Sequence, residues 1–418
     1  AHHALLKQLE HYSADHGCVV VMETKTGHIK AISNLGRADD GSYYETQNYA
    51  ITESHEPGST FKLMDLIAVL DDKKADTGTV YNSFGGEIEY YKRKVRDSHK
   101  GGYGKISLAR GFELSSNTVL VQSVYESYKN NPKQFVDRIN SYGLNKPLGL
   151  PIKGEGIPVI PQPGTNRWSG VSLPWMAFGY GLSVTPLQTL TLYNAVANNG
   201  VMVKPIFVSE IKEWNKTIKK FDTQVINPKI CSQETLDKVH AVLENVVKKG
   251  TGSKLYSKDF SMAGKTGTAQ VNYKDKSKLY YASSFVGYFP ADEPKYSCIV
   301  VVHKPNVAAG YYGADVAGPV FKRIAQKIFT DSPSMNHVKN IDAKVVSQEK
   351  NYAEYYKKVE KEERIVPNVK GMEGMDAVAL LENLGLKVIV KGVGRVKNQS
   401  LTSGQAFNKN QTIIIELS

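Results

Sequence analysis

The sequence predicts an α+β fold with an antiparallel sheet, because strand and helix patterns come in blocks instead of alternating along the chain. Strand patterns occupy residues 18–33 and 260–303, and the stretch between them is mainly helical. A second compact unit begins at Ile365. At 418 residues the chain exceeds one average domain, so we expect two folded units.

The first strands read as a hairpin. The apolar runs CVVVME and HIKAIS flank Lys25-Thr26-Gly27, and Gly27 can take the positive φ that a tight hairpin turn requires. The same tripeptide recurs at residues 265–267. We interpret the first copy as a structural turn and look for chemistry in the second.

Helix patterns fill the middle of the chain. The segment after Pro57-Gly58 is apolar around most of its circumference, which predicts a buried helix. The later strands read FSMAGKTGTAQV, YASSFVGYFPA and KYSCIVVVHKP. The expected helices occupy residues 59–72, 107–127 with a break at SSN, 186–197, 232–250 with Ser232 as N-cap, and 318–329.

The expected domain limits follow from composition. Residues 338–364 are strongly charged and end in KKVEKEER, which is typical of a solvated helix or linker. Beyond them, IVPNVKG precedes a short helix and two strands, KVIVKGVG and QTIIIELS. We therefore expect a large domain over residues 1–337, a linker over 338–364 and a small α+β domain over 365–418.

The amino-acid composition indicates which classes of binding partner to expect. Basic side chains number 53 against 41 acidic ones, a net charge of +12, which favours anionic surroundings such as phospholipid or cell-wall polymer. Because no basic run is interleaved with aromatic residues, we expect no nucleic-acid partner. The three cysteines have no metal-binding spacing, and we expect neither a metal nor an organic cofactor.

No stretch approaches the length of a membrane span, and no signal peptide is visible. The chain also begins without Met. We expect a processed or trimmed form whose anchor is missing.

The start of the buried helix reads EPGSTFK. Residues three apart share a helix face, so Ser59 and Lys62 point the same way. Lys62 can act as a base for Ser59 if burial lowers its pKa, and the helix start offers a free backbone N–H to a developing oxyanion. The pattern alone is weak, because Ser209–Lys212 and Ser347–Lys350 match it as well.

Two further motifs carry side chains for catalysis or binding. ELSSNTV places Ser115 and Asn117 in one turn, where a hydroxyl can relay a proton and an amide can hold a carbonyl. In AGKTGTAQV, strand alternation puts Thr266 and Thr268 on one face, and Gly267 lets another backbone lie close, as when a peptide adds to a sheet edge. A phosphate loop is excluded, because it needs Gly where residue 259 is Asp.

The order of the three motifs is the strong signal. GSTFK, SSN and GKTGT, together with GYGLSVTPLQ and SFVGYFPA, resemble the transpeptidase domain of class B penicillin-binding proteins. Residues 365–418, with VPNVKG, resemble a PASTA module, which in this family points to division-type enzymes. The resemblance implies a five-stranded antiparallel sheet flanked by helices, with the site between the sheet edge and the buried helix.

The resemblance also implies roles. Ser59 would be the acyl-forming nucleophile and Lys62 its general base. Ser115 would pass a proton to the leaving D-alanine, and Asn117 would steady the acyl donor. Lys265 would tune the Ser115 hydroxyl and attract the terminal carboxylate. The carboxylate would be gripped by Thr266 and Thr268, and the backbone N–H groups of Ser59 and Thr268 would form the oxyanion hole.

The implied partners are D-Ala-D-Ala stem peptides as donor, an amine of a neighbouring stem as acceptor, and β-lactams. For the full-length protein they include a membrane glycosyltransferase and division proteins, at the extracytoplasmic face of the bacterial plasma membrane. The PASTA unit either binds muropeptide or packs against the catalytic domain.

Two other classes of function stay open. A serine β-lactamase or D,D-carboxypeptidase needs an added base for water, and only Glu113 and Glu155 are candidates, with surface roles favoured for both. A non-catalytic β-lactam sensor or scaffold is the third class. We expect a loop or rim role for His99, while Trp168 and Trp175 border the cleft or pack a long loop.

Overall fold

The computed structural model describes residues 1–214, 216–273, 275, 277–331 and 364–418. The chain forms two compact units, Ala1–Ser332 and Pro333–Ser418. The expected charged linker over residues 338–364 lies, apart from Arg364, outside the described residues.

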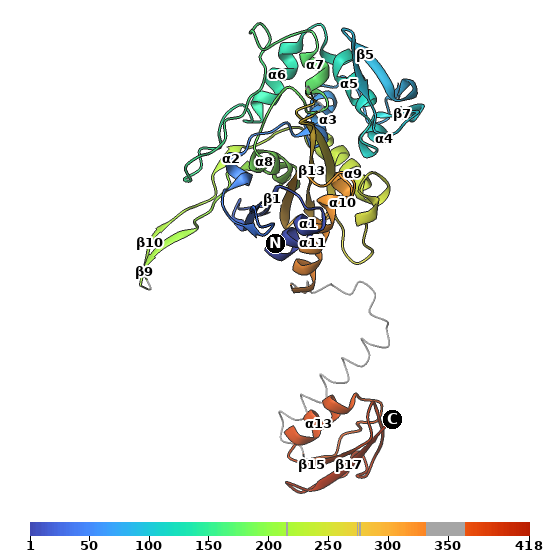
Figure 1. Ribbon diagram of the computed structural model, residues 1–418. Coiled ribbons are helices and arrows are strands. Elements are labelled where there is room, and N and C mark those ends of the chain that lie inside the picture. The colour runs from blue at the N-terminus through green and yellow to red at the C-terminus, as the bar shows by residue number, and fades with distance from the viewer. Residues whose placement is uncertain (215, 274, 276, 332–363) are drawn as a thin grey trace. The chain divides into compact units, whose positions relative to one another are not determined.

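The first unit contains a six-stranded antiparallel sheet in the order β12-β13-β14-β1-β2-β3. Its strands β1 and β13 lie in the middle of the unit (Figure 1). Five long strands match the expected five, and the two-residue strand β3 extends one edge as a sixth. At the other edge, β13 is the one strand that pairs with β12 among the described residues. The strands are β1 (His16–Glu23), β2 (Ile29–Arg37), β3 (Tyr43–Tyr44), β12 (Ala263–Val271), β13 (Tyr280–Phe289) and β14 (Tyr296–His303).

The sheet is buried on both faces, as strand β1 shows. Cys18 and Val20 belong to one hydrophobic cluster, whereas Val19 and Val21 belong to a second. Successive side chains of a strand point to opposite faces, so the two clusters lie on opposite sides of the sheet. The continuous apolar run of β1 is therefore typical of a central strand whose two faces are both covered by helices.

Helices cover each face (Figure 1). The first cluster includes side chains of α3 (Lys62–Asp71), α5 (Asn117–Tyr128), α8 (Pro186–Ala197) and α9 (Gln233–Lys249). The second includes side chains of α1 (His2–His11) and α11 (Gly318–Asp331). The smaller elements are α2 (Tyr49–Thr52), α4 (Leu108–Glu113), α6 (Pro132–Ser141), α7 (Ser172–Met176), α10 (Gly313–Val316), the 3-10 turns η1 (Gly58–Thr60), η2 (Phe84–Gly86) and η3 (Ser253–Leu255), and the strands β4 (Val80–Asn82), β5 (Glu87–Tyr90), β6 (Arg93–Arg96), β7 (Lys105–Ser107), β8 (Met202–Val203), β9 (Glu210–Glu213), β10 (Lys216–Lys220) and β11 (Val225–Asn227).

Local signals in the sequence explain several boundaries. Gly27 takes a φ of 79° in the β1–β2 turn, and a Cβ there would lie 2.4 Å from the carbonyl oxygen of Lys204, so the first copy of the tripeptide is a structural turn, as predicted. Ser232 caps α9 by accepting from the backbone N–H of Thr235, also as predicted.

The second unit has its own small core. Its three strands lie in the order β15-β17-β16, with β15 parallel and β16 antiparallel to β17. Helix α13 contributes Ala377, Leu380 and Leu381 to the core. The elements are α13 (Gly374–Asn383), β15 (Lys387–Lys391), β16 (Val396–Gln399) and β17 (Thr412–Leu417).

The three cysteines are buried free thiols, in agreement with their apolar surroundings in the sequence. None of the helices in the described part of the chain combines the length and the apolar character that a membrane span requires.

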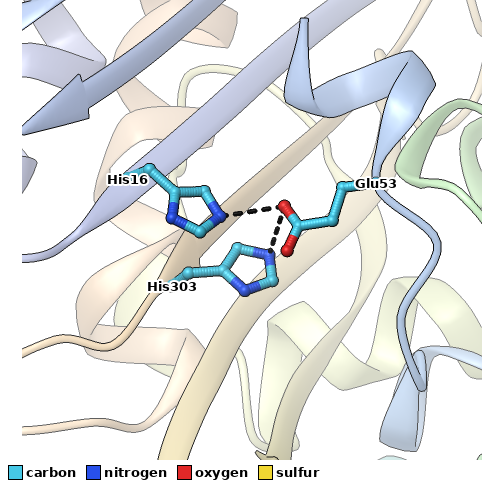
Figure 2. A group of neighbouring side chains, drawn as sticks. All are labelled: His16, Glu53 and His303. Atoms are coloured by element: carbon cyan, nitrogen blue, oxygen red, sulfur yellow. Dashed lines mark hydrogen bonds and ion pairs between the residues drawn. The ribbon is translucent and has the colours of Figure 1, made fainter. Parts of the chain in front are cut away.

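A polar cluster ties the start of β1 to the end of β14 and to the segment after α2 (Figure 2). His16 Nε2 lies 2.8 Å from a carboxylate oxygen of Glu53, and His303 Nε2 lies 3.7 Å from the same oxygen. The rings of His16 and His303 stack with centroids 4.4 Å apart. Burial would raise the pKa of Glu53, but the hydrogen bond from His16 and the neighbouring histidines lower it to about 2.

This cluster predicts a pH dependence of stability. Because the pKa of Glu53 is lower in the folded state than its ordinary 4.5, its contribution is present above pH 4.5 and is lost as pH falls toward 2. Glu53→Gln is expected to reduce the free energy of unfolding by at most about 3 kcal/mol at neutral pH. Urea unfolding at pH 7 and at pH 2.5 measures this, and the difference from wild type should shrink as the pH falls below 4.5.

The matched control is Glu234→Gln, which removes the charge of an exposed ion pair with Lys238 on α9. A surface pair of that kind contributes little. Equal losses for the two variants at pH 7 would contradict the prediction.

Candidate active site

Segments far apart in the sequence meet at a cleft of about 730 Å³ beside strand β12, the free edge of the main sheet. The turn η1 reaches it from one side and the turn between α4 and α5 from another. Of the predicted site residues, five line the cleft, namely Ser59, Ser115, Asn117, Thr266 and Thr268. The side chains of Lys62 and Lys265 are fully buried.

Ser59 lies in the 3-10 turn η1, and helix α3 begins only at Lys62. This differs slightly from the expected position in the first turn of an α-helix. Gly58 has a φ of 56°, and its N–H donates to the carbonyl of Gly179 at 3.1 Å. Tyr193 on α8 donates its hydroxyl to the carbonyl of Thr60 at 2.8 Å. The turn that presents Ser59 is therefore held from two sides.

Lys62 lies beneath this turn and reaches the middle motif. Its Nζ donates to the Asn117 side-chain oxygen at 2.6 Å and to the Ser115 carbonyl at 2.8 Å, and lies 3.3 Å from Ser115 Oγ. Burial lowers the pKa of Lys62 to about 7, against the opposing charges of Asp97 and Asp65. Near neutral pH a large fraction of Lys62 is thus unprotonated, which a base requires.

The backbone of the middle motif is strained. Ser115 has a φ of 57°, a conformation that non-glycine residues rarely adopt and that is often found at functional sites. Ser116 caps α5 by accepting from the backbone N–H of Val119. The break between α4 and α5 that the sequence predicted therefore turns the carbonyl and hydroxyl of Ser115 toward Lys62.

Lys265 bonds within its own strand, and its expected action on the Ser115 hydroxyl stays a prediction. Its Nζ donates to the carbonyl of Thr266 at 3.2 Å and lies 5.6 Å from the centre of the Phe112 ring. Among the described residues no hydrogen bond joins it to Ser115, nor does one join Ser59 to Lys62. Burial and the charge of Lys62 lower the pKa of Lys265 well below its usual range. Two ammonium groups in one buried site repel each other, which favours a neutral form for one of them.

Strand β12 presents its threonines as the alternation predicted. Thr268 Oγ1 accepts from the N–H of Gly313 at 3.0 Å, and Thr266 Oγ1 lies 2.7 Å from the hydroxyl of Thr251. Gly267 has a structural role besides the expected close approach of a peptide backbone, which stays a prediction. A Cβ there would lie 2.2 Å from Ser284 Oγ and 2.9 Å from Thr60 Cγ2, so Gly267 makes room for the packing of η1 against the sheet.

Several cleft residues were missed by the sequence analysis. Asp97 lines the cleft and binds the start of α5. Tyr180 accepts from the N–H of Gln270 at 2.8 Å, on the free edge of β12. These residues come from separate loops, and no local pattern marks them. The aromatic side chains that line the cleft are Trp175, Phe178, Tyr180, Tyr273, Tyr281, Tyr311 and Tyr312.

The two candidate bases for water lie elsewhere. Glu113 is buried, not on the surface as expected, and pairs with Arg110 at 2.8 Å. The carboxylate of Glu155 accepts from the backbone N–H groups of Leu148 and Leu150. Neither carboxylate lines the cleft. Both make structural contacts, and neither is placed to act as the base for water.

His99, Trp168 and Trp175 take different places in the structure. His99 stacks on Tyr103 with ring centroids 5.0 Å apart, which fits the expected loop role. Trp175 lines the cleft, whereas Trp168 packs against the large hydrophobic cluster.

His16, Glu53 and His303 are the one group of metal-ligand type found among the described residues. The imidazole planes differ by only 11° and are stacked. A ligated metal lies near the plane of each imidazole, so one ion cannot bind both rings unless one of them turns. The contacts present are those of a hydrogen-bonded cluster.

The fold and the cleft, with a serine turn facing a sheet edge over a buried lysine, are those of the serine transpeptidase class. Residues 17–326 match the penicillin binding protein transpeptidase domain, and residues 364–418 match the PASTA domain. The chain therefore belongs to the penicillin-binding protein transpeptidase family and carries a PASTA domain.

Similar proteins include stage V sporulation protein D of Bacillus subtilis, which is 29% identical over 97% of this chain and 61% of its own length. Peptidoglycan D,D-transpeptidase FtsI of Escherichia coli is 29% identical over 74% of this chain and 50% of its own length. The chain thus spans between half and two thirds of the length of these curated relatives.

Solved structures share the fold. Penicillin binding protein 3 from Mycobacterium tuberculosis, complexed with aztreonam, has a TM-score of 0.68 at 25% identity, covering 79% of this chain and 75% of that one. The transpeptidase domain of penicillin-binding protein 3 from Burkholderia pseudomallei has a TM-score of 0.66 at 24% identity, covering 81% and 94%.

Proposed function

We propose that this chain is a peptidoglycan D,D-transpeptidase that cross-links stem peptides through an acyl-enzyme on Ser59. The observation that carries the proposal is the buried Lys62, which bonds Ser115 and Asn117 in the wall of the cleft that Ser59 also lines, and which has a pKa of about 7. A lysine in this state accepts a proton at neutral pH, and burial keeps water from competing for it.

In the first step, neutral Lys62 removes the proton of Ser59 Oγ, which attacks the carbonyl of the penultimate D-alanine. Ser59 lies in η1 and Lys62, three residues later, begins α3, and the contact between nucleophile and base often tightens only once substrate is bound. Ser115 Oγ, which lies 3.3 Å from Lys62 Nζ, passes the proton to the leaving nitrogen. The C–N bond breaks and D-alanine departs as an amine.

Binding of the donor uses strand β12. The hydroxyls of Thr266 and Thr268 hold the terminal carboxylate, and Lys265 adds attraction when it is protonated. Backbone N–H groups of Ser59 and Thr268 stabilise the oxyanion, each worth about 3 kcal/mol in comparable sites. Asn117 steadies the acyl donor while its side-chain oxygen accepts from Lys62.

In the second step, an amine of a neighbouring stem attacks the acyl carbon and Ser59 is released as a hydroxyl. β-Lactams resemble the donor dipeptide and acylate Ser59 in the same way. The names of the relatives support the reaction class, since FtsI is called a peptidoglycan D,D-transpeptidase. The PASTA domain supports a division-type, septal role for this chain.

The proposal includes a place in the cell. The full-length protein is held at the extracytoplasmic face of the plasma membrane by a segment that precedes these residues, and works with a membrane glycosyltransferase and division proteins. A β-lactamase or carboxypeptidase is disfavoured because Glu113 and Glu155, the two bases considered for water, lie outside the cleft.

The test is the fate of the acyl group. With a D-Ala-D-Ala stem peptide and an acceptor amine, we expect D-alanine release together with the cross-linked product. With a chromogenic β-lactam we expect stoichiometric acylation and slow turnover. Rapid, repeated hydrolysis would favour a β-lactamase, and acylation without D-alanine release would favour a sensor.

A further inference from the structure

Asp97 belongs to the loop that follows β6, and its carboxylate is the meeting point of several donors. Oδ1 accepts from the backbone N–H of Asn117 at 2.6 Å and of Thr118 at 3.0 Å. Oδ2 accepts from the hydroxyl of Thr118 at 2.9 Å and of Ser116 at 3.0 Å. One carboxylate from a separate loop thus binds three consecutive residues.

These three residues begin helix α5, whose first backbone N–H groups have no partner within the helix. A carboxylate at a helix N-terminus is favoured by the helix dipole as well as by the hydrogen bonds. Ser116 already caps the N–H of Val119 from within the chain. Asp97 supplies a second cap from outside, and this cap connects the β5–β6 hairpin to the helix.

The contacts of Asp97 help to fix Asn117, which makes three hydrogen bonds. Its backbone N–H donates to Asp97, its side-chain nitrogen donates to the carbonyl of Arg96 at 2.6 Å, and its side-chain oxygen accepts from Lys62. Ser115, two residues before Asn117, has the strained φ of 57°. A strained residue keeps its conformation only if its surroundings determine it, and the contacts of Asp97 lie directly after it.

The same carboxylate acts on Lys62 through its charge. The charged groups that face Lys62 are Asp97 from the β6–β7 loop, Asp65 from its own helix and Lys265 from β12. Burial lowers the pKa of Lys62, and Asp97 is the larger of the two opposing charges. Asp97 therefore keeps Lys62 protonated to a higher pH than burial alone would allow.

We propose that Asp97 is a positioning residue of the active site, which holds the Ser115–Asn117 turn against Lys62 and whose negative charge acts on that lysine. The proposal rests on the proposed function, because it assigns Asp97 a part in acylation of Ser59. It concerns a residue that touches the turn and not the reacting atoms.

The test compares Asp97→Asn and Asp97→Ala with wild type by the rate of acylation with a fluorescent penicillin between pH 5 and 9. Asparagine keeps an acceptor for the two N–H groups but removes the charge. An opposite charge nearby typically shifts a pKa by about 1 to 3 units, so the acid limb of the Asp97→Asn profile should move down by about one pH unit. Alanine removes both the charge and the acceptor, so its acid limb should move in the same direction, and its rate at pH values above the limb should fall about tenfold because the Ser115–Asn117 turn is no longer held.

Asp137→Asn, which removes one carboxylate from an exposed pair with Lys133 on α6, is the matched control and should keep the wild-type profile. Thermal unfolding of each variant separates loss of folding from loss of positioning. The proposal is overturned if Asp97→Asn gives the wild-type pH profile, or if Asp97→Ala unfolds at a lower temperature but acylates at the wild-type rate. Absence of a Ser59 adduct in the wild type would instead overturn the proposed function.

Discussion

Replacing Ser59 with alanine is expected to abolish covalent capture of penicillin. Ser59 lines the cleft in a turn that is held from two sides, and the acyl bond of the proposed reaction forms on its Oγ. Intact-mass analysis after incubation with benzylpenicillin should show one added penicilloyl group on the native chain and none on Ser59→Ala. The occupancy should fall from near complete to undetectable.

The chain offers a matched control. Ser209 has the same spacing to a lysine, Lys212, yet lies among exposed residues before the β9–β10 hairpin. Ser209→Ala should therefore acylate like the native chain. A persistent adduct on Ser59→Ala, mapped to another residue, would contradict the assignment of the nucleophile.

Replacing Lys62 with methionine is expected to reduce the rate of acylation by about 10²- to 10⁴-fold, the usual contribution of a general base. Methionine has similar length and tolerates the buried site, but it can neither accept a proton nor donate to Asn117. The native chain should lose activity as pH falls below about 7, because Lys62, with its pKa of about 7, becomes protonated. That acid limb should be missing from the variant.

Stopped-flow acylation with a fluorescent penicillin between pH 5.5 and 9 measures both effects. Lys212→Met, on the exposed hairpin, is the control and should keep the rate and the limb. If Lys62→Met retained an acid limb near pH 7, another group would have to be the base.

The elements of the fold could be predicted because their signals are local. Gly27 in its turn, the break between α4 and α5 and the Ser232 cap each depend on residues within one turn of chain. The apolar circumference of the segment after Gly58 likewise predicted a helix whose residues Lys62 to Leu70 are all buried. Propensity and periodicity act over these short distances.

The contacts of charged residues were harder to predict. Glu113 was expected at the surface, yet Arg110 and Lys249 approach it and it is buried. The Nζ of Lys265 donates to the carbonyl of Thr266, a contact that the sequence did not indicate, while its expected action on the Ser115 hydroxyl stays a prediction. In each case the partner is chosen by how the elements pack, and a single charged residue in a sequence has no pattern that reveals it.

The sequence by itself determined which motifs form the cleft. GSTFK, SSN and GKTGT occur in the order that indicates this fold, and Ser59, Ser115 and Thr266 from these motifs line the cleft. Only the tertiary structure decided how those side chains behave. The pKa of Lys62 depends on its burial and on the charge of Asp97. The cluster of His16, Glu53 and His303 forms because β1 and β14, which are far apart in the sequence, pair in the sheet. Desolvation and Coulomb energy vary with distances through space, and those distances exist only after the sheet has formed.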